Sequence, residues 1–210
     1  KELTNGKQQF MYKKDDAVIE FDDFHKNIRI GAITTFDANM PSLEEYQKFI
    51  VTRSDKIRSE LDWTVERIMD IYYKYVNSIS QEVENAIKQN KLDTLAQYYR
   101  KKTEFLQLMN ELFSSTHKSI FESENGLQFK LNDETVIPPN ELSSGEKQLL
   151  ILMIFSLAQR ELEFITFWDE PEISLHIDWQ RMLIRTIRKL NPNGQLIIST
   201  HSHSIIYEGW

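Results

Sequence analysis

The C-terminal third of the chain alternates between segments with helical periodicity and short apolar runs. Apolar residues recur at helical spacing over 146–161 and about 178–190, which predicts two helices. The runs 164–168 and 195–199 are short and apolar throughout, as expected of strands that are buried on both faces. Strands and helices in alternation predict a parallel sheet with helices on its faces, and therefore an α/β fold.

The middle of the chain, from 42 to about 122, has neither proline nor glycine, and its apolar residues recur at helical spacing. Ser42-Leu43-Glu44-Glu45 has the spacing of a capping box, so we expect the first helix to begin there. The composition changes near 85–93, which predicts that two long antiparallel helices reverse at that point. A packed helical lobe fits the irregular, aromatic stripe better than a long coiled coil, which stays the alternative.

Two other regions predict β structure. Three short β-like runs lie between residues 8 and 36, the last of them at 28–33, and they favour a small unit of antiparallel strands. Farther on, 127–131 alternates as a strand, and Asn132-Asp133 supplies a turn into 135–137. A hairpin is therefore expected just before the C-terminal third.

Composition and charge narrow the class of protein. With 210 residues, 40% of them apolar and 27% charged, the chain is expected to be globular, and no apolar run approaches the roughly 20 residues that span a bilayer. The absence of cysteine and of a secretory leader indicates a cytoplasmic protein without membrane contact. A net charge of −7 argues against a DNA-binding surface over the whole chain. The cluster 100–102 is a candidate basic patch, although a solvated helix face is the favoured interpretation.

The most informative chemistry lies at the carboxyl end of the run 164–168, where two carboxylates follow directly. Ligands of parallel sheets bind at the carboxyl ends of strands, so Asp169 and Glu170 stand where chemistry is expected. In a nucleotide hydrolase, the first acid organises Mg²⁺ and the second polarises the attacking water. We assign Asp169 to the metal and Glu170 to the water. The alternative is a solvated strand end that carries two acids.

A second candidate site is the start of the helix at 146–161. Ser143, Ser144 and Gly145 come just before it, and free amides, a small hydroxyl and a glycine at a helix N-terminus together suit a phosphate. The alternative is an ordinary helix cap with a glycine beside it.

Histidines supply the third candidate. His201 follows the run 195–199, where an imidazole can donate a hydrogen bond to a terminal phosphate or hold a water in line. His203 competes for this role. A zinc site built from His176, His201 and His203 is disfavoured, because no ligand pair shares a helical face and no cysteine is present.

These segments together resemble the ATPase domain of the ABC superfamily, in its SMC-like and antiviral-defence branch. The resemblance covers 142–203. Leu142–Gln148 resembles the signature motif, Phe164–Glu170 the Walker B strand, Ser174-Leu175-His176 the D-loop, and Thr200-His201-Ser202 the switch-histidine loop. It implies an ABC-type ATPase lobe with a mainly parallel sheet, a small antiparallel β unit and an inserted long helical hairpin.

The resemblance also implies ATP and Mg²⁺ as cofactors, with Asp169 on the metal and with Glu170 and His201 as catalytic residues. In this family, the signature of one subunit contacts the ATP that the other subunit holds. The protein is then a homodimer or a higher even-numbered oligomer. The residues implied at the partner's ATP phosphates are Ser143, Ser144, Gly145 and Glu146, with Ser174, Leu175 and His176 in the D-loop.

The family's Walker A loop, Gly-x-x-x-x-Gly-Lys followed by Ser or Thr, is not found in this sequence, since Gly6-Lys7 is followed by Gln8. We expect the loop to precede Lys1; the alternative is a partner chain that contributes only its signature. The family's Q-loop is not assigned, and 34–37 is a candidate junction between lobes. The chain divides into a β-rich part of the nucleotide-binding lobe (1–40), a helical insertion (41–124) and a part with signature, Walker B and switch histidine (125–210).

At a finer level, the insertion and signature are most similar to ATPases of bacterial antiviral systems such as Septu and certain retrons, which work beside a nuclease. The resemblance thus implies a nuclease or other effector as partner, nucleic acid contacted directly or through that effector, and ATP-dependent gating in antiviral defence. Three alternatives stay open: an SMC-like ATPase of DNA repair or chromosome maintenance, a noncatalytic assembly module, and an ABC transporter subunit, which the long helical insertion disfavours.

Overall fold

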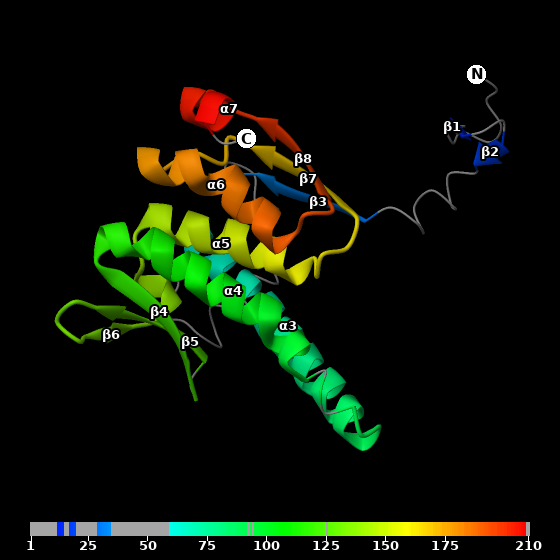
Figure 1. Ribbon diagram of the computed structural model, residues 1–210. Coiled ribbons are helices and arrows are strands. Elements are labelled where there is room, and N and C mark those ends of the chain that lie inside the picture. Colours follow the sequence, from blue (N-terminus) through cyan, green and yellow to red (C-terminus); the bar gives the residue numbers. More distant parts are fainter. Residues whose placement is uncertain are drawn as a thin grey trace, which may run out of the picture.

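The computed structural model describes residues 12–14, 17–19, 29–34, 59–91, 93, 95–124 and 126–208 (Figure 1). Over these residues the chain has the expected α/β fold, with a parallel sheet, small antiparallel sheets and two long helices. Near the N-terminus, β1 (Tyr12–Lys14) and β2 (Ala17–Ile19) form the antiparallel pair that the sequence predicts.

The parallel sheet carries the residues of interest at one edge. Its strand order is β3 (Ile30–Thr34), β7 (Phe164–Asp169) and β8 (Gly194–Ser199). The prediction of an antiparallel strand at 28–33 is wrong, because β3 pairs in parallel with β7, from Ile30 beside Ile165 to Thr34 beside Asp169. A short apolar run pairs with whichever sheet edge the tertiary fold presents, so the sequence around it does not reveal the partner.

Helix α5 (Ser144–Ala158) forms the centre of the core. It is buried on nearly all sides, as expected of a helix that is apolar around its whole circumference. Figure 1 shows it between α6 (Ile177–Leu190) and the two long helices. On its sheet side, a Cβ at Gly31 would lie 2.4 Å from the ring of Phe155, so the glycine lets α5 approach β3 closely.

The two faces of the parallel sheet differ in exposure. One face is covered: Trp168 of β7 is 2% exposed. On the other face, Ile30, Phe167 and Ile197 are 49%, 42% and 43% exposed, one from each strand. The prediction that these strands are buried on both faces is therefore wrong within the described residues. A continuous apolar run does not specify how many layers pack against the sheet.

The helical insertion consists of α3 (Glu60–Lys88) and α4 (Leu95–Phe113), which reverse at 89–94, at the edge of the predicted interval. Helix α3 begins at Ser59, whose hydroxyl accepts a hydrogen bond from the Asp62 amide at 3.1 Å. The helix start expected at Ser42 lies outside the described residues. Buried residues follow one stripe of α3 as far as Ala86, and α3 packs against α5 (Figure 1). The insertion is therefore packed against the ATPase-like part along its base.

The second antiparallel sheet differs from the prediction at one point. The expected hairpin is present as β5 (Gly126–Leu131) and β6 (Val136–Ile137). The helix expected to continue to about 122 ends at Phe113, and a short 3-10 turn, Ser114–Thr116, leads into β4 (Lys118–Ser123), which pairs with β5. His117, at φ 58°, turns the chain between them. No glycine or proline follows this helix end, so the helix end could not be predicted from the residues around it.

Candidate functional site

The site begins with the register of the parallel strands. Asp169, the last residue of β7, lies beside Thr34 of β3 and beside Ser199 of β8, so three carboxyl ends meet at one edge of the sheet. Asp169 and Ser199 are both exposed there. The edge therefore presents a carboxylate and a hydroxyl to solvent at the position where parallel sheets bind ligands.

Glu170 directly follows and adopts an unusual backbone conformation. Its φ is 45°, in the left-handed region that a residue with a side chain seldom enters. The Glu170 amide donates a hydrogen bond to the carbonyl oxygen of Ser199 at 2.8 Å, which continues the β7–β8 pairing by one residue. A residue keeps such a strained backbone conformation only where the contacts around it hold it in place. Residues of this kind cluster at functional sites.

The structure brings His201 to Glu170. Nε2 of the imidazole lies 3.3 Å from Oε1 of the Glu170 carboxylate, and the His201 side chain is 90% exposed. The two residues follow adjacent parallel strands, β7 and β8, so the sheet itself brings them together. An exposed imidazole beside a carboxylate can share or transfer a proton at this edge.

The start of α5 is held by a capping box. The hydroxyl of Ser143 accepts a hydrogen bond from the Glu146 amide at 3.4 Å, and the Glu146 carboxylate accepts one from the Ser143 amide at 2.9 Å. Glu146 is buried and also accepts a hydrogen bond from Lys118 at 2.7 Å. These two side chains hold the helix start, and in its first turn Ser144 is exposed whereas Gly145 and Glu146 are buried.

The electrostatics of Glu146 agree with this structural role. Burial by itself would raise the pKa of this carboxyl group, but hydrogen bonds from Lys118 and from the Ser143 backbone outweigh burial and lower the pKa below its ordinary value. Glu146 is therefore a carboxylate that stays ionised and fixes the helix N-terminus.

The start of α5 touches the loop between β7 and α6. A Cβ added to Gly145 would lie 2.2 Å from the carbonyl oxygen of Ser174. Only a glycine allows the backbone of the loop between β7 and α6 to approach the first turn of α5 so closely. Ser174 itself has φ 65°. The glycine that the sequence offered as a site for phosphate approach thus also serves an internal contact.

The remaining histidines have structural positions. His176 is the N-cap of α6, where Nδ1 accepts a hydrogen bond from the Asp178 amide at 3.4 Å, and Leu175 beside it is buried. His203 begins α7 (His203–Glu208), where its ring stacks on Tyr207 with centroids 6.1 Å apart. In the part of the chain that the structure describes, no cluster of three or more His, Asp or Glu side chains forms a metal site.

The edge residues nevertheless fit a Mg²⁺ ion carried by a nucleotide. Mg²⁺ is bound through oxygen, commonly by one or two carboxylates together with substrate phosphates, rather than by a full protein cage. Asp169 offers an exposed carboxylate at the strand end, and the neighbouring Ser199 offers a hydroxyl. Asp169 is the residue that would hold the ion.

Sequence reasoning missed two residues that organise this edge. Glu172 accepts hydrogen bonds from two backbone amides of the loop that carries His201, and Gln180 of α6 holds the hydroxyl of Ser202. The only sequence signal for Glu172 was a third acid close behind Asp169 and Glu170. Nothing in the sequence pattern pointed to Gln180.

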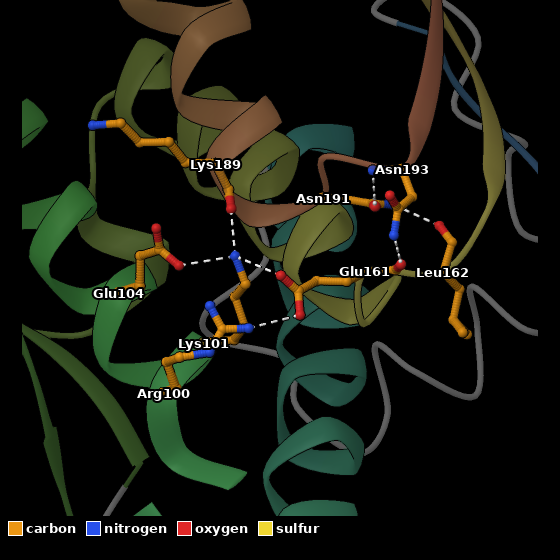
Figure 2. A network of polar contacts seen from close by, with 8 residues as sticks. All are labelled: Arg100, Lys101, Glu104, Glu161, Leu162, Lys189, Asn191 and Asn193. Atoms are coloured by element: carbon orange, nitrogen blue, oxygen red, sulfur yellow. Dashed lines mark hydrogen bonds and ion pairs between the residues drawn. The ribbon is translucent and has the colours of Figure 1, made fainter. Parts of the chain in front are cut away.

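The candidate basic patch at 100–102 is paired with acids. Arg100 and Lys101 contact Glu161 (Figure 2). Lys102 contacts Glu122 at 2.6 Å. The Arg100 side chain is 59% exposed, as on the solvated helix face that the sequence favoured, whereas those of Lys101 and Lys102 are 14% and 15% exposed and tie α4 to its neighbours. Among the described residues, no helix is both long enough and apolar enough to cross a membrane.

Comparison with solved structures finds SMC head domains. One is the SMC head domain from Thermotoga maritima, at 20% identity and a TM-score of 0.39, covering 58% of this chain and 45% of that one. Another is the Pyrococcus furiosus Smc head with an extended coiled coil, bound to the C-terminal domain of ScpA, at 15% identity and a TM-score of 0.40, covering 85% of this chain and 56% of that one. The chain thus spans about half the length of these relatives.

Comparison with protein families finds one that spans almost the whole chain. The sequence profile of the AAA ATPase domain matches residues 5–206, which include the three strand ends, the start of α5 and the His201 loop. The chain therefore belongs to the AAA ATPase domain family, a family of ATP-binding ATPases.

Proposed function

We propose that this protein hydrolyses ATP at the edge formed by β7 and β8, as an ABC-type ATPase of the SMC-like branch. The observation that carries the proposal is the contact between Glu170 and His201, 3.3 Å apart at the carboxyl ends of two adjacent parallel strands. A carboxylate and an imidazole so placed can orient a water and a terminal phosphate in line.

Each residue at this edge then has a distinct role. Asp169 holds Mg²⁺, which when bound neutralises charge on the phosphate oxygens. Glu170 accepts a proton from the attacking water or polarises it, and His201 donates a hydrogen bond to the terminal phosphate or keeps the water in line. Glu170 leaves the extended conformation of β7 at φ 45°, and its carboxylate contacts His201 at 3.3 Å. This separates the tasks of two acids that are adjacent in the sequence.

The start of α5 belongs, in this proposal, to a site shared between two copies. Ser144 and the first amides of α5 contact the phosphates of ATP held by the partner subunit, and Ser143 and Glu146 fix the helix start that presents them. Ser174, Leu175 and His176 form the D-loop beside it. A homodimer, or a higher even-numbered oligomer, then encloses two ATP molecules.

The experiment is ATP turnover by the full-length protein, with Glu170→Gln compared with the parent. We expect turnover to fall by at least about a hundredfold, because the amide cannot take a proton from water. Glu163→Gln is the matched control, since Glu163 is exposed at the opposite end of β7 and should keep parental turnover. Equal turnover by the parent and Glu170→Gln would remove Glu170 from the catalytic role.

We also propose a place for this ATPase in the cell. The similarity of its insertion and signature to ATPases of antiviral systems supports a cytoplasmic protein that gates a nuclease or other effector, with nucleic acid contacted directly or through that effector. Copurification from cells at native expression, with nuclease activity measured with and without ATP, tests this. An effector whose activity is indifferent to ATP and to Glu170→Gln would contradict the gating.

A second candidate function has one observation in its favour. Residues 1–210 contain no Walker A motif, and a noncatalytic assembly module that supplies only its signature would not need one. Retention of partner binding and of cellular function after Asp169→Asn and Glu170→Gln are combined would favour this module over the ATPase.

A further inference from the structure

Glu172 lies in the loop between β7 and α6 and holds the backbone of a different loop. Its Oε1 accepts hydrogen bonds from two successive amides, that of His201 at 2.8 Å and that of Ser202 at 3.1 Å. Hydrogen bonds from amides to a carboxylate are about twice as strong as those between neutral groups. The other oxygen, Oε2, is buried and has no hydrogen-bond partner among the described residues. The hydrogen bonds of the Glu172 carboxylate among the described residues are therefore the two to the backbone of His201 and Ser202.

A second tie reaches the same loop from α6. The Ser202 hydroxyl donates a hydrogen bond to Oε1 of Gln180 at 2.6 Å, and the Gln180 amide group donates one to the carbonyl oxygen of Leu175 at 2.9 Å. The same Ser202 oxygen accepts a hydrogen bond from the Ile205 amide at 3.3 Å, at the start of α7. The segment 200–202 is thus attached at two points, to Glu172 in the loop after β7 and to Gln180 of α6.

These attachments matter because packing does little to hold the imidazole. The His201 side chain is 90% exposed, so its position relative to Glu170 depends mainly on where the backbone of residue 201 lies. Glu172 bonds that backbone directly, and it is only two residues from Glu170 along the chain. The short segment 170–172 therefore carries two carboxylates with different tasks. Glu170 faces the imidazole of His201, and Glu172 holds the backbone amide of His201.

We propose that Glu172 is a positioning residue that fixes His201 against Glu170. The proposal rests on the function proposed above for Glu170 and His201. Glu172 does not touch ATP; it acts through the backbone amides of His201 and Ser202. A displacement of about 1 Å at a reacting group can cost about a hundredfold in rate, so we expect Glu172→Ala to lower kcat by about ten- to a hundredfold while the KM for ATP stays within about twofold.

Hydrogen exchange of the full-length protein tests the contact without relying on activity. In Glu172→Ala, exchange over 200–205 should be faster than in the parent, by at least about tenfold at the His201 amide, which loses its acceptor, whereas the Ser202 amide keeps Oγ1 of Thr200 at 3.0 Å. Glu172→Gln keeps an acceptor oxygen at the same reach and should exchange within about threefold of the parent. Glu172→Asp keeps the charge but is one methylene shorter, so it should behave like Glu172→Ala and also serves if Glu172→Ala does not fold.

A double-mutant cycle with His201→Ala tests whether Glu172 acts through His201. If it does, adding Glu172→Ala to His201→Ala lowers kcat no further, because the imidazole that Glu172 positions is already gone. Glu172→Gln should retain kcat within about threefold of the parent, and Glu163→Ala, an exposed acid, should leave it unchanged.

Two results would overturn the proposal: unchanged exchange over 200–205 in both Glu172→Ala and Glu172→Asp, or kcat losses that multiply in the double variant. The exchange measurement separates this proposal from the proposed function. A parent protein with no ATP turnover contradicts the ATPase, whereas the exchange of 200–205 still decides whether Glu172 holds the loop.

Discussion

At the scale of single residues, the loop after β7 depends on two unusual backbone conformations and one glycine. Glu170 and Ser174 have φ values of 45° and 65°, and the carbonyl oxygen of Ser174 lies where a Cβ of Gly145 would be. A left-handed conformation costs a residue with a side chain about 1–3 kcal/mol, which the surrounding contacts must offset. The loop is therefore held in one shape by its contacts with α5 and with the His201 loop.

Replacement of Gly145 tests this contact. We expect Gly145→Ala to lower the free energy of unfolding by about 1–3 kcal/mol, because the new methyl group meets a backbone carbonyl that cannot rotate away. Ser144→Ala is the matched control in the same helical turn, and as an exposed position it should cost about 0.5 kcal/mol or less. Urea unfolding of both variants measures the difference. Equal costs would mean that the loop moves freely away from α5.

At the scale of elements, a polar network joins the helical insertion to the sheet-bearing part (Figure 2). Lys101 of α4 contacts Glu104 and Glu161, each at 2.9 Å, and donates a hydrogen bond to the carbonyl oxygen of Lys189 at the end of α6. Asn193 donates a hydrogen bond to the Glu161 carbonyl oxygen at 2.7 Å. The network thus connects α4, the turn after α5 and the turn before β8.

Glu161 makes this network sensitive to acid. Burial raises the pKa of its carboxyl group, but Lys101 and Arg100 together outweigh burial, so the pKa lies below its ordinary value of 4.5. A carboxylate with a lowered pKa in the folded state stabilises the fold above that ordinary value, and the stabilisation is lost as the pH falls through the folded pKa.

Lys101→Met should therefore destabilise the protein in a pH-dependent way. We expect a loss of about 1–2 kcal/mol in the free energy of unfolding at pH 7, because the Lys101 ammonium, whose side chain is 14% exposed, no longer contacts Glu104 and Glu161 and, among the described residues, only Arg100 still pairs with Glu161. The loss should shrink as the pH falls from about 4.5 through the lowered pKa at which Glu161 protonates in the parent. Lys88→Met is the control, since the Lys88 side chain is 67% exposed and its pair with Glu84 lies in solvent, where an ion pair contributes little to stability. A loss that does not change with pH would contradict the role of Glu161.

At the scale of the whole molecule, the proposed function needs two copies. The proposed phosphate contacts of α5 and the edge of β7 and β8 are both parts of one chain, and in the proposed dimer each copy's α5 meets the ATP of the other. The association then depends on nucleotide, and a variant that binds ATP without hydrolysing it should accumulate as the dimer.

Light scattering on the full-length protein checks this expectation. Glu170→Gln should double its molar mass with Mg²⁺ and ATP and return to the monomer when the nucleotide is removed. Ser144→Arg in the same background should stay monomeric, because the long side chain occupies the place proposed for the partner's phosphates. Ser119→Arg introduces the same side chain on β4 and should leave the dimer intact. A mass that is unaffected by Ser144→Arg would contradict the proposed interface.

The motifs could be predicted from the sequence because each depends on local pattern. Asp169, Glu170 and His201 follow short apolar runs. Such runs predict strands, so the polar residues that come after them are placed at the carboxyl ends of those strands. The helix predicted from 146 begins two residues earlier, at Ser144, and the capping box between Ser143 and Glu146 is seen only in the structure. The ATPase family that these motifs implied agrees with the family profile that the chain matches.

Other features were decided only by the tertiary structure. The parallel pairing of β3 with β7 and the bonds from Glu172 to the His201 loop join segments that are distant in the sequence. The exposure of Phe167 depends on whether another layer packs against that face of the sheet. Sequence periodicity is a property of neighbouring residues, whereas strand pairing, layering and contacts between loops depend on how the whole chain packs. The sequence alone therefore determined which residues are candidates for the chemistry, and the fold determined which of these candidates meet.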